Sequence, residues 1–240
     1  MQSSLYVALS GQLALHRRLE TIASNVANAS SAGFRAQQVK FESFISQVPL
    51  EPVAFASTGK SYLSRTPGEL IRTDHPLDVA IEGDGWLAIQ TPSGIVYTRD
   101  GRMRMTEAGD LQTITGYPVL DVGGAPILLD PEGGPPQIAR DGTITQDNQQ
   151  IGALGLFRID PEAELIRAEG SGVIPDRPAE PILDFVRDGV IQGYIERANV
   201  NPVLEMTHLI MVSRAFDAVT SSLNETESSL REAVRTLGSG

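Results

Sequence analysis

The sequence predicts an α+β protein in which long helices at the two ends of the chain flank an all-β central domain. Apolar residues recur every three or four positions only near the two ends, as in helices that pack along one face. Between these ends, short runs of Val, Ile and Thr alternate with Gly, Pro, Asp and Asn, as in strands joined by turns. The expected domains are a helical domain from 1–30 and 199–240, an extended connecting arm from 31–74, and a β-rich domain from 75–198.

The first helix is expected over residues 4–28. Its apolar positions alternate in steps of three and four, which gives a narrow seam like that of a coiled coil. The seam consists of Leu5, Ala8, Gln12, Leu15, Leu19, Ile22 and Val26. Small and polar residues from Asn28 to Gly33 end the pattern.

The second helix is expected over residues 202–237. Asn201 is a good N-cap, Pro202 suits the first helical position, and Glu205 falls in the first turn. Its seam consists of Leu209, Val212, Phe216, Val219, Leu223, Thr226, Leu230, Ala233 and Leu237. The spacing predicts that the two helices pack antiparallel or side by side, with contacts from Leu15, Leu19, Ile22, Phe216, Val219 and Leu223.

Two interpretations of the paired ends remain open at this point. One is a helical hairpin that packs on a globular body. The other is a pair that also packs against copies of itself or against relatives. The second seam is longer than the first, which favours the second interpretation because a lone pair would leave part of that seam uncovered.

The middle of the chain carries several turn signals. Arg-Asp-Gly occurs at 99–101, 140–142 and 187–189, and Asp-Gly between apolar runs favours a hairpin turn. "LDVAIEGDGWLAIQ" reads as two strands around Glu82 to Gly85, and "EAGDLQT" as another turn. We expect about ten short strands between 75 and 195. The pattern over 40–74 is compatible with a short helix or an extended arm.

Composition excludes several functional classes. The formal net charge of the 240 residues is −11 and no segment concentrates Lys and Arg, so nucleic-acid binding is not expected. The chain has no cysteine, which excludes disulfides and thiolate chemistry. No apolar run is long enough for a membrane span, and the N-terminus lacks the pattern of a cleavable signal peptide.

No pattern of residues indicates catalysis. The three histidines stand apart from one another, and G-x-S-x-G, H-E-x-x-H and P-loop motifs are missing. We therefore expect no catalytic residue, no bound cofactor and no metal. A carbohydrate-binding β domain or an adhesin on a helical stalk stays open as an alternative to an assembly protein.

Motifs at both ends resemble those of bacterial flagellar rod and hook proteins. The family's first signature is Asn-hydrophobic-Ala-Asn, then Thr, then Gly-aromatic-basic, and "SNVANASSAGFRA" matches it with Ser31 in place of Thr. Its second is Ser-Asn-Val, Glu-Met and Arg-Ala-aromatic, and "RANVNPVLEMTHLIMVSRAF" matches it with Ala198 in place of Ser. "PLDVAIEGDGWLAIQ" and "YTRDGRMRM" resemble the start of the family's β domain. Length, Gly85-Trp86 and Asn201-Pro202-Val203 most resemble proximal-rod subunits, and distal-rod subunits are the nearest alternative.

The resemblance implies a structural subunit of the flagellar basal-body rod, the driveshaft that transmits motor torque to the hook across the periplasm. Terminal helices would form the inner tube, and β domains the outer layer. The implied partners are copies of this chain, other proximal-rod and distal-rod subunits, and the flagellar type III export apparatus. That apparatus would export the chain without cleavage of a signal peptide. Neither nucleic acid nor a small-molecule substrate is implied.

The motif residues are expected to serve assembly: Asn25, Asn28, Gly33, Phe34, Asn199, Val200, Glu205, Arg214 and Phe216. Asn25 and Asn28 would satisfy backbone groups where the helix ends. Gly33 would take a positive φ in a turn outside the β body. Phe34 would anchor that turn against the C-terminal helix or a neighbouring subunit.

Overall fold

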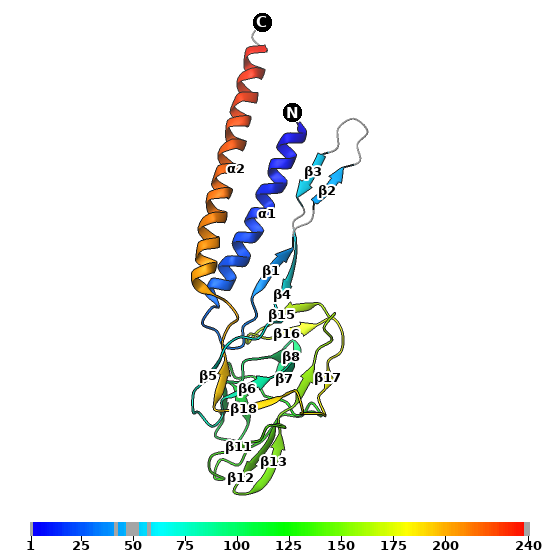
Figure 1. Ribbon diagram of the computed structural model, residues 1–240, viewed down its shortest axis with the longest axis vertical. Coiled ribbons are helices and arrows are strands. Elements are labelled where there is room, and N and C mark those ends of the chain that lie inside the picture. The colour runs from blue at the N-terminus through cyan, green and yellow to red at the C-terminus, as the bar shows by residue number, and fades with distance from the viewer. Residues whose placement is uncertain (1, 41–42, 47–52, 57–58, 238–240) are drawn as a thin grey trace. The chain divides into compact units, whose positions relative to one another are not determined.

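The computed structural model describes residues 2–40, 43–46, 53–56 and 59–237. The chain divides into two compact units, each considered by itself below. Residues 1–27, 37–62 and 201–240 form a helical unit, and residues 28–36 and 63–200 form a β-rich unit. Helices at the two ends of the chain flank a β-rich region, so the α+β class is as predicted (Figure 1).

The helical unit is built on an antiparallel pair of helices, α1 (Gln2–Ala27) and α2 (Pro202–Leu237) (Figure 1). Side-chain contacts between them run in opposite order along the two helices. Gln12 donates a hydrogen bond to Thr220 at 3.0 Å. The rings of His16 and Phe216 lie 6.2 Å apart.

One face of each helix is the less exposed one. On α1, Ile22 is buried, and Leu15 and Leu19 are half-buried. On α2, Val212 is buried, and the half-buried positions that follow the same stripe are Leu209, Phe216, Val219 and Leu223. Thr226 is exposed. The side chains of Leu5, Leu230, Ala233 and Leu237 lie outside the described part of the structure, so their expected seam contacts stay predictions.

Strands complete the helical unit. β1 (Gln37–Lys40) pairs with β4 (Lys60–Leu63), and β2 (Ser43–Ser46) pairs antiparallel with β3 (Val53–Ala56). In the segment 40–74, which the sequence left open between a short helix and an extended arm, the described elements are strands, including those at 43–46, 53–56, 60–63 and 70–72, and irregular residues join the last two of these. Residues 41–42, 47–52 and 57–58 lie outside the described residues.

A six-stranded antiparallel sheet is the largest sheet of the β-rich unit. Its order is β15-β16-β8-β7-β14-β17. The strands are β7 (Gly85–Thr91), β8 (Gly94–Thr98), β14 (Leu156–Arg158), β15 (Leu165–Arg167), β16 (Val173–Pro175) and β17 (Glu180–Pro181).

Smaller antiparallel sheets surround it. The three-stranded sheet is β11 (Gln137–Ile138), β12 (Thr143–Gln146) and β13 (Gln149–Ala153). The three pairs are β9 (Met103–Met105) with β10 (Leu111–Thr113), β6 (Val79–Glu82) with β18 (Gly189–Gln192), and β5 (Leu70–Arg72) with β19 (Tyr194–Glu196).

The core of the β-rich unit is aliphatic, and β7 divides it in two. Leu87 and Ile89 point into the main core, which also contains Val79, Val96 and Leu111. Trp86, the only tryptophan of the chain, lies on the opposite face of β7. It packs in a second cluster, which also contains Leu63, Ile159, Ala163 and Val173. The period-two alternation of a strand therefore places Trp86 away from the main core.

Only one Arg-Asp-Gly tripeptide forms the expected hairpin turn. The second, at 140–142, joins β11 to β12, and the amide of Gly142 donates to the carbonyl of Ala139 at 2.9 Å. The first and third join strands of different sheets, β8 to β9 and β17 to β18, so the prediction was wrong for them. Both aspartates, Asp100 and Asp188, are buried. Asp100 accepts hydrogen bonds from Arg102, two residues further on, whereas Asp188 accepts one from the amide of the distant Asp84.

We predict that Asn201→Ala frays the first turn of α2. The Asn201 side-chain oxygen accepts hydrogen bonds from the amides of Val203 and Leu204, both at 3.1 Å. Losing an N-cap of this kind costs about 1 kcal/mol. Hydrogen exchange should therefore quicken roughly fivefold at these two amides, whereas Asn201→Asp, which keeps a capping oxygen, should leave the rate nearly unchanged. Equal rates in all three proteins would contradict the cap.

Candidate assembly site around the N-terminal turn

The segment 28–36, which follows α1 in the chain, is part of the β-rich unit. It turns at once, because the amide of Ser31 donates to the carbonyl of Asn28 at 3.0 Å. The amide of Gly33 then donates to the carbonyl of Glu196 at 2.8 Å, and the carbonyl of Phe34 accepts from the amide of Asn199 at 3.2 Å. Backbone pairing thus joins the first motif of the sequence to the second. The expectation that the turn lies outside the β body was wrong.

Gly33 has the positive φ expected of it, 65°. The structure adds a second reason for glycine at this position. A Cβ atom built there would lie 2.2 Å from the backbone nitrogen of Asp100 and 2.4 Å from the carbonyl carbon of Arg99. The turn therefore passes so close to the backbone after β8 that no side chain fits between the two segments.

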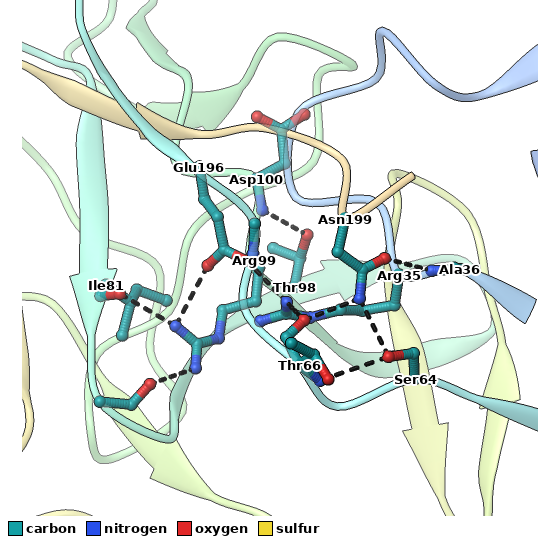
Figure 2. Close-up of polar contacts among 12 residues, drawn as sticks. Arg35, Ala36, Ser64, Thr66, Ile81, Thr98, Arg99, Asp100, Glu196 and Asn199 are labelled. Atoms are coloured by element: carbon teal, nitrogen blue, oxygen red, sulfur yellow. Dashed lines mark hydrogen bonds and ion pairs between the residues drawn. The ribbon is translucent and has the colours of Figure 1, made fainter. Parts of the chain in front are cut away.

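Asn199 uses both ends of its side-chain amide to bind two other segments. Its oxygen accepts a hydrogen bond from the amide of Ala36 at 2.6 Å. Its nitrogen donates to the hydroxyl of Ser64 at 3.1 Å and to the carbonyl of Thr66 at 2.7 Å (Figure 2). Three stretches of chain that are far apart in sequence meet at this one side chain.

A buried carboxylate lies beside this junction (Figure 2). Glu196, 1% exposed, pairs through Oε1 with Nη1 of Arg35 at 2.8 Å and through Oε2 with Nη1 of Arg99 at 3.2 Å. The amide of Gly68 donates to the same Oε1 at 2.9 Å. Both oxygens of this carboxylate are therefore bound, and the two guanidinium groups share one negative charge.

The two arginines complete their contacts with backbone carbonyls and with an aromatic ring. Arg35 donates to the carbonyl of Thr66, and Arg99 donates to the carbonyls of Ile81, at 3.0 Å, and of Gly83. The guanidinium carbons lie 5.6 Å (Arg35) and 5.5 Å (Arg99) from the centre of the Trp86 ring, within the range of cation–π attraction.

Burial is the main electrostatic effect on these arginines. It lowers the pKa of Arg35 to about 10, against the opposing effect of Glu196, and it lowers the pKa of Arg99 in the same way. Both remain cationic at neutral pH. Among the described residues no acceptor pairs with Nε or Nη2 of Arg35 or with Nε of Arg99. Glu196 and the ring of Trp86 are therefore the direct contacts that compensate the two buried charges, and the charge of Asp84 adds a weaker favourable effect on both arginines.

Phe34 lies elsewhere than expected. It is buried in the β-rich unit, at 2% exposure, with the guanidinium of Arg167 over its ring at 4.0 Å. Arg167 also donates to the backbone carbonyl of Arg35 at 2.5 Å. Phe34 therefore anchors the turn within its own unit, because a large aromatic ring there fills space that the turn would otherwise leave open.

Four of the other motif residues belong to the helical unit: Asn25, Glu205, Arg214 and Phe216. Asn25 is buried and binds the backbone of Gln37 twice: it accepts from the Gln37 amide at 2.8 Å and donates to its carbonyl at 2.9 Å. It also donates to Glu205 of α2 at 3.4 Å. Asn25 thus connects α1 with β1 and α2. Arg214 is exposed, and Val200, at the end of the β-rich unit, is half-buried.

Sequence reasoning missed the charged members of the site. The sequence marks Arg35 only as the basic position of a motif and Arg99 only as a predicted turn residue, and no motif includes Glu196. A usable signal was present for Glu196, since a charged residue ends the run "GVIQGYIE" in a stretch of strand residues. Nothing in the sequence indicates that Arg35, Arg99 and Glu196 meet, because pairing between distant segments creates the cluster.

The described residues show no group of three or more His, Asp or Glu side chains that could hold a metal ion. None of the helices in the described part is long and apolar enough to cross a membrane.

Three family descriptions match the chain, and each covers one part of this site. "Flagella basal body rod protein" matches residues 5–35, "Flagellar hook protein FlgE/F/G D1 domain" matches 80–146, and "Flagellar basal body rod FlgEFG protein C-terminal" matches 191–236. Arg35, Arg99 and Glu196 come from the first, second and third of these segments respectively.

Similarity over the full length decides among the named members. The flagellar basal-body rod protein FlgF of Mesorhizobium japonicum is 54% identical, over 100% of this chain and 99% of its own. The FlgF protein of Rhizobium meliloti is 47% identical, over 99% of both chains. The chain belongs to the FlgF family of flagellar basal-body rod proteins. The FlgG rod protein of Bacillus subtilis, at 27% identity over 98% of both chains, is less similar to this FlgF-family chain.

We predict that Gly33→Ala destabilises this FlgF-family protein much more than Gly124→Ala does. Both glycines have a positive φ, 65° and 82°, so alanine introduces backbone strain of about 1–2 kcal/mol at either position. Only at Gly33 does the new Cβ meet backbone atoms, whereas no atom lies within 4 Å at Gly124. Urea unfolding, followed by Trp86 fluorescence, should give the two variants free energies of unfolding that differ by at least about 2 kcal/mol. Equal losses would contradict the close approach at Gly33.

We predict that Glu196→Gln lowers the free energy of unfolding by about 3–5 kcal/mol, because it removes the carboxylate that is directly paired with both buried guanidiniums. The matched control is Glu69→Gln. The Glu69 side chain is 76% exposed, and its Oε2 lies 4.0 Å from Nη1 of Arg197. An exposed ion pair of this kind contributes little to the free energy of unfolding. Urea unfolding of the three proteins measures both losses. A Glu196→Gln protein as stable as the control would show that the carboxylate is dispensable.

Proposed function

We propose that this chain is a structural, non-enzymatic subunit of the proximal rod. Its helical unit would line the inner tube, and its β-rich unit would form the outer layer of the driveshaft that transmits torque from the motor to the hook. The helical unit, residues 1–27, 37–62 and 201–240, would make the tube, and the β-rich unit, residues 28–36 and 63–200, would face outward. Membership of the FlgF family supports assembly with other rod proteins.

One observation supports polymerisation of this chain more than any other: the helix pair exposes two apolar patches. On α1, Tyr6, Leu9 and Leu13 lie on one stripe and are 45–59% exposed. On α2, the apolar residues opposite the packed face are Val203, Leu204, Met206, Ile210 and Met211, which are 51–74% exposed. Clustered exposed apolar side chains of this kind mark interaction surfaces.

The two patches lie at opposite ends of the antiparallel pair. The N-terminal half of α1 lies beside the Phe216–Thr220 region of α2, whereas the first turns of α2 lie beside Asn25 at the far end of α1. Two different patches at opposite ends suit a heterologous contact, in which each subunit stacks on the next and the chain of contacts does not close. Such contacts generate a tube or filament rather than a two-fold dimer.

The proposed route to the periplasmic rod is the flagellar type III export apparatus, without signal cleavage. α1 supplies half of the helix pair, with contacts such as the one between Gln12 and Thr220. A route that keeps these residues is therefore consistent with the helix pair.

We predict that Ile210→Glu prevents rod assembly without unfolding the subunit. Ile210 is 53% exposed on the outward face of α2. A glutamate carboxylate at this position is therefore solvated in the free subunit but would be buried against apolar surface in a rod, which is unfavourable. Purified variant and parent should have the same helix content and thermal midpoint, while basal bodies from cells that express the variant should lack complete rods.

The matched control is Ser221→Glu. Ser221 lies eleven residues further along α2, about three turns, so it shares the face of Ile210 but lies outside the apolar patch. This variant should support motility. Normal rods with Ile210→Glu would contradict the proposed contact, and loss of rods with both variants would indicate that any charge on this face is harmful.

A further inference from the structure

We propose that Met206 and Met211 form a redox-sensitive modification site on α2, and that their oxidation to the sulfoxide prevents the subunit from assembling. This inference rests on the proposed function, because it concerns the apolar patch at the start of α2. It adds the chemical class of the modifying agent, which is a hydroperoxide. It also adds the consequence, which is that the oxidised subunit no longer assembles.

The exposure of the methionines differs sharply along the chain. Met206 is 55% exposed and Met211 is 63% exposed. Met103 is 1% exposed in the main core of the β-rich unit, and Met105 is half-buried beside it. A thioether is oxidised where an oxidant can reach its sulfur, so Met206 and Met211 should react before Met103 and Met105 in the folded protein.

The two methionines flank the middle of the patch. At 100° per residue, Val203 and Ile210 share one line along α2, with Met206 on one side of that line and Met211 on the other. Neither belongs to the face formed by Val212, Phe216 and Val219 that packs against α1. Oxidation therefore changes the outward surface and leaves the contacts within the helix pair intact.

The chemistry needs only a hydroperoxide. The methionine sulfur attacks the terminal peroxide oxygen, and an S–O bond forms while the O–O bond breaks. The proton of the transferred OH passes to the leaving oxygen, which departs as water from hydrogen peroxide or as an alcohol from an organic hydroperoxide. The sulfur loses two electrons and the peroxide gains them. The flexible apolar side chain becomes a polar one that requires hydrogen bonds, and burial of that group in an apolar contact is unfavourable. A methionine sulfoxide reductase would reverse the change.

The first test measures reactivity. The folded full-length protein is treated with dilute hydrogen peroxide, and peptide mass spectrometry follows the addition of one oxygen to each methionine. Met206 and Met211 should oxidise on the order of tenfold faster than Met103, while the thermal midpoint stays unchanged. Equal rates at all three positions, or a loss of fold that accompanies oxidation of Met206 and Met211, would overturn the inference.

The second test measures the consequence in cells. Met206→Gln/Met211→Gln places polar side chains of similar length at both positions and should abolish basal-body rods. Met206→Leu/Met211→Leu keeps the surface apolar and should support normal rods. Normal rods with the Gln pair would overturn the inference. If Ile210→Glu blocks assembly but the Gln pair does not, only the redox site fails; if neither blocks it, the proposed assembly surface fails as well.

Discussion

The β-rich unit depends on one buried carboxylate. Glu196 compensates two guanidinium groups, those of Arg35 and Arg99, and all three side chains are at most 3% exposed. Charges in such surroundings are tolerated only when paired and hydrogen-bonded. Each partner comes from a different part of the chain, so the cluster forms only when the N-terminal turn, the end of β8 and the end of β19 are all in place. The cation–π contacts with Trp86 and the glycine at position 33 follow from the same close approach.

This dependence gives the N-terminal motif a physical meaning. Residues 28–36 are not a spacer after α1; they supply Phe34 and Arg35 to the interior of the β-rich unit and pair with the backbone of residues 196–199. The β-rich unit is therefore complete only when both ends of the chain have reached it. The segments that complete the β-rich unit are those directly next to α1 and α2 in the chain. In the proposed rod, these two helices carry the contact surfaces.

The sequence predicted what periodicity and local chemistry determine, and little else. The bounds of α2, its cap at Asn201 and the positive φ of Gly33 are local properties, and they were predicted correctly. The first and third Arg-Asp-Gly segments join strands of different sheets, and their aspartates are buried. Asp188 is fixed by the distant residues Asp84 and Arg158, whereas Asp100 pairs with Arg102 two residues further on. No local pattern distinguishes a buried turn-like segment from a surface one. The sequence also did not predict that Arg35, Arg99 and Glu196 meet, because pairing between distant segments brings them together. Exposure of Met206 and Met211 likewise became visible only once the packed face of α2 was known.

Glu196 couples residues 28–36 to the rest of the β-rich unit, and a double-mutant cycle tests this coupling most directly. Arg35→Met and Glu196→Gln are made singly and together, and urea unfolding is followed by the fluorescence of Trp86, the only tryptophan. The account predicts a coupling free energy above about 2 kcal/mol, so that the double variant is far more stable than the sum of the single losses implies. A coupling within about 0.5 kcal/mol of zero would show that the two residues act independently and would contradict the account.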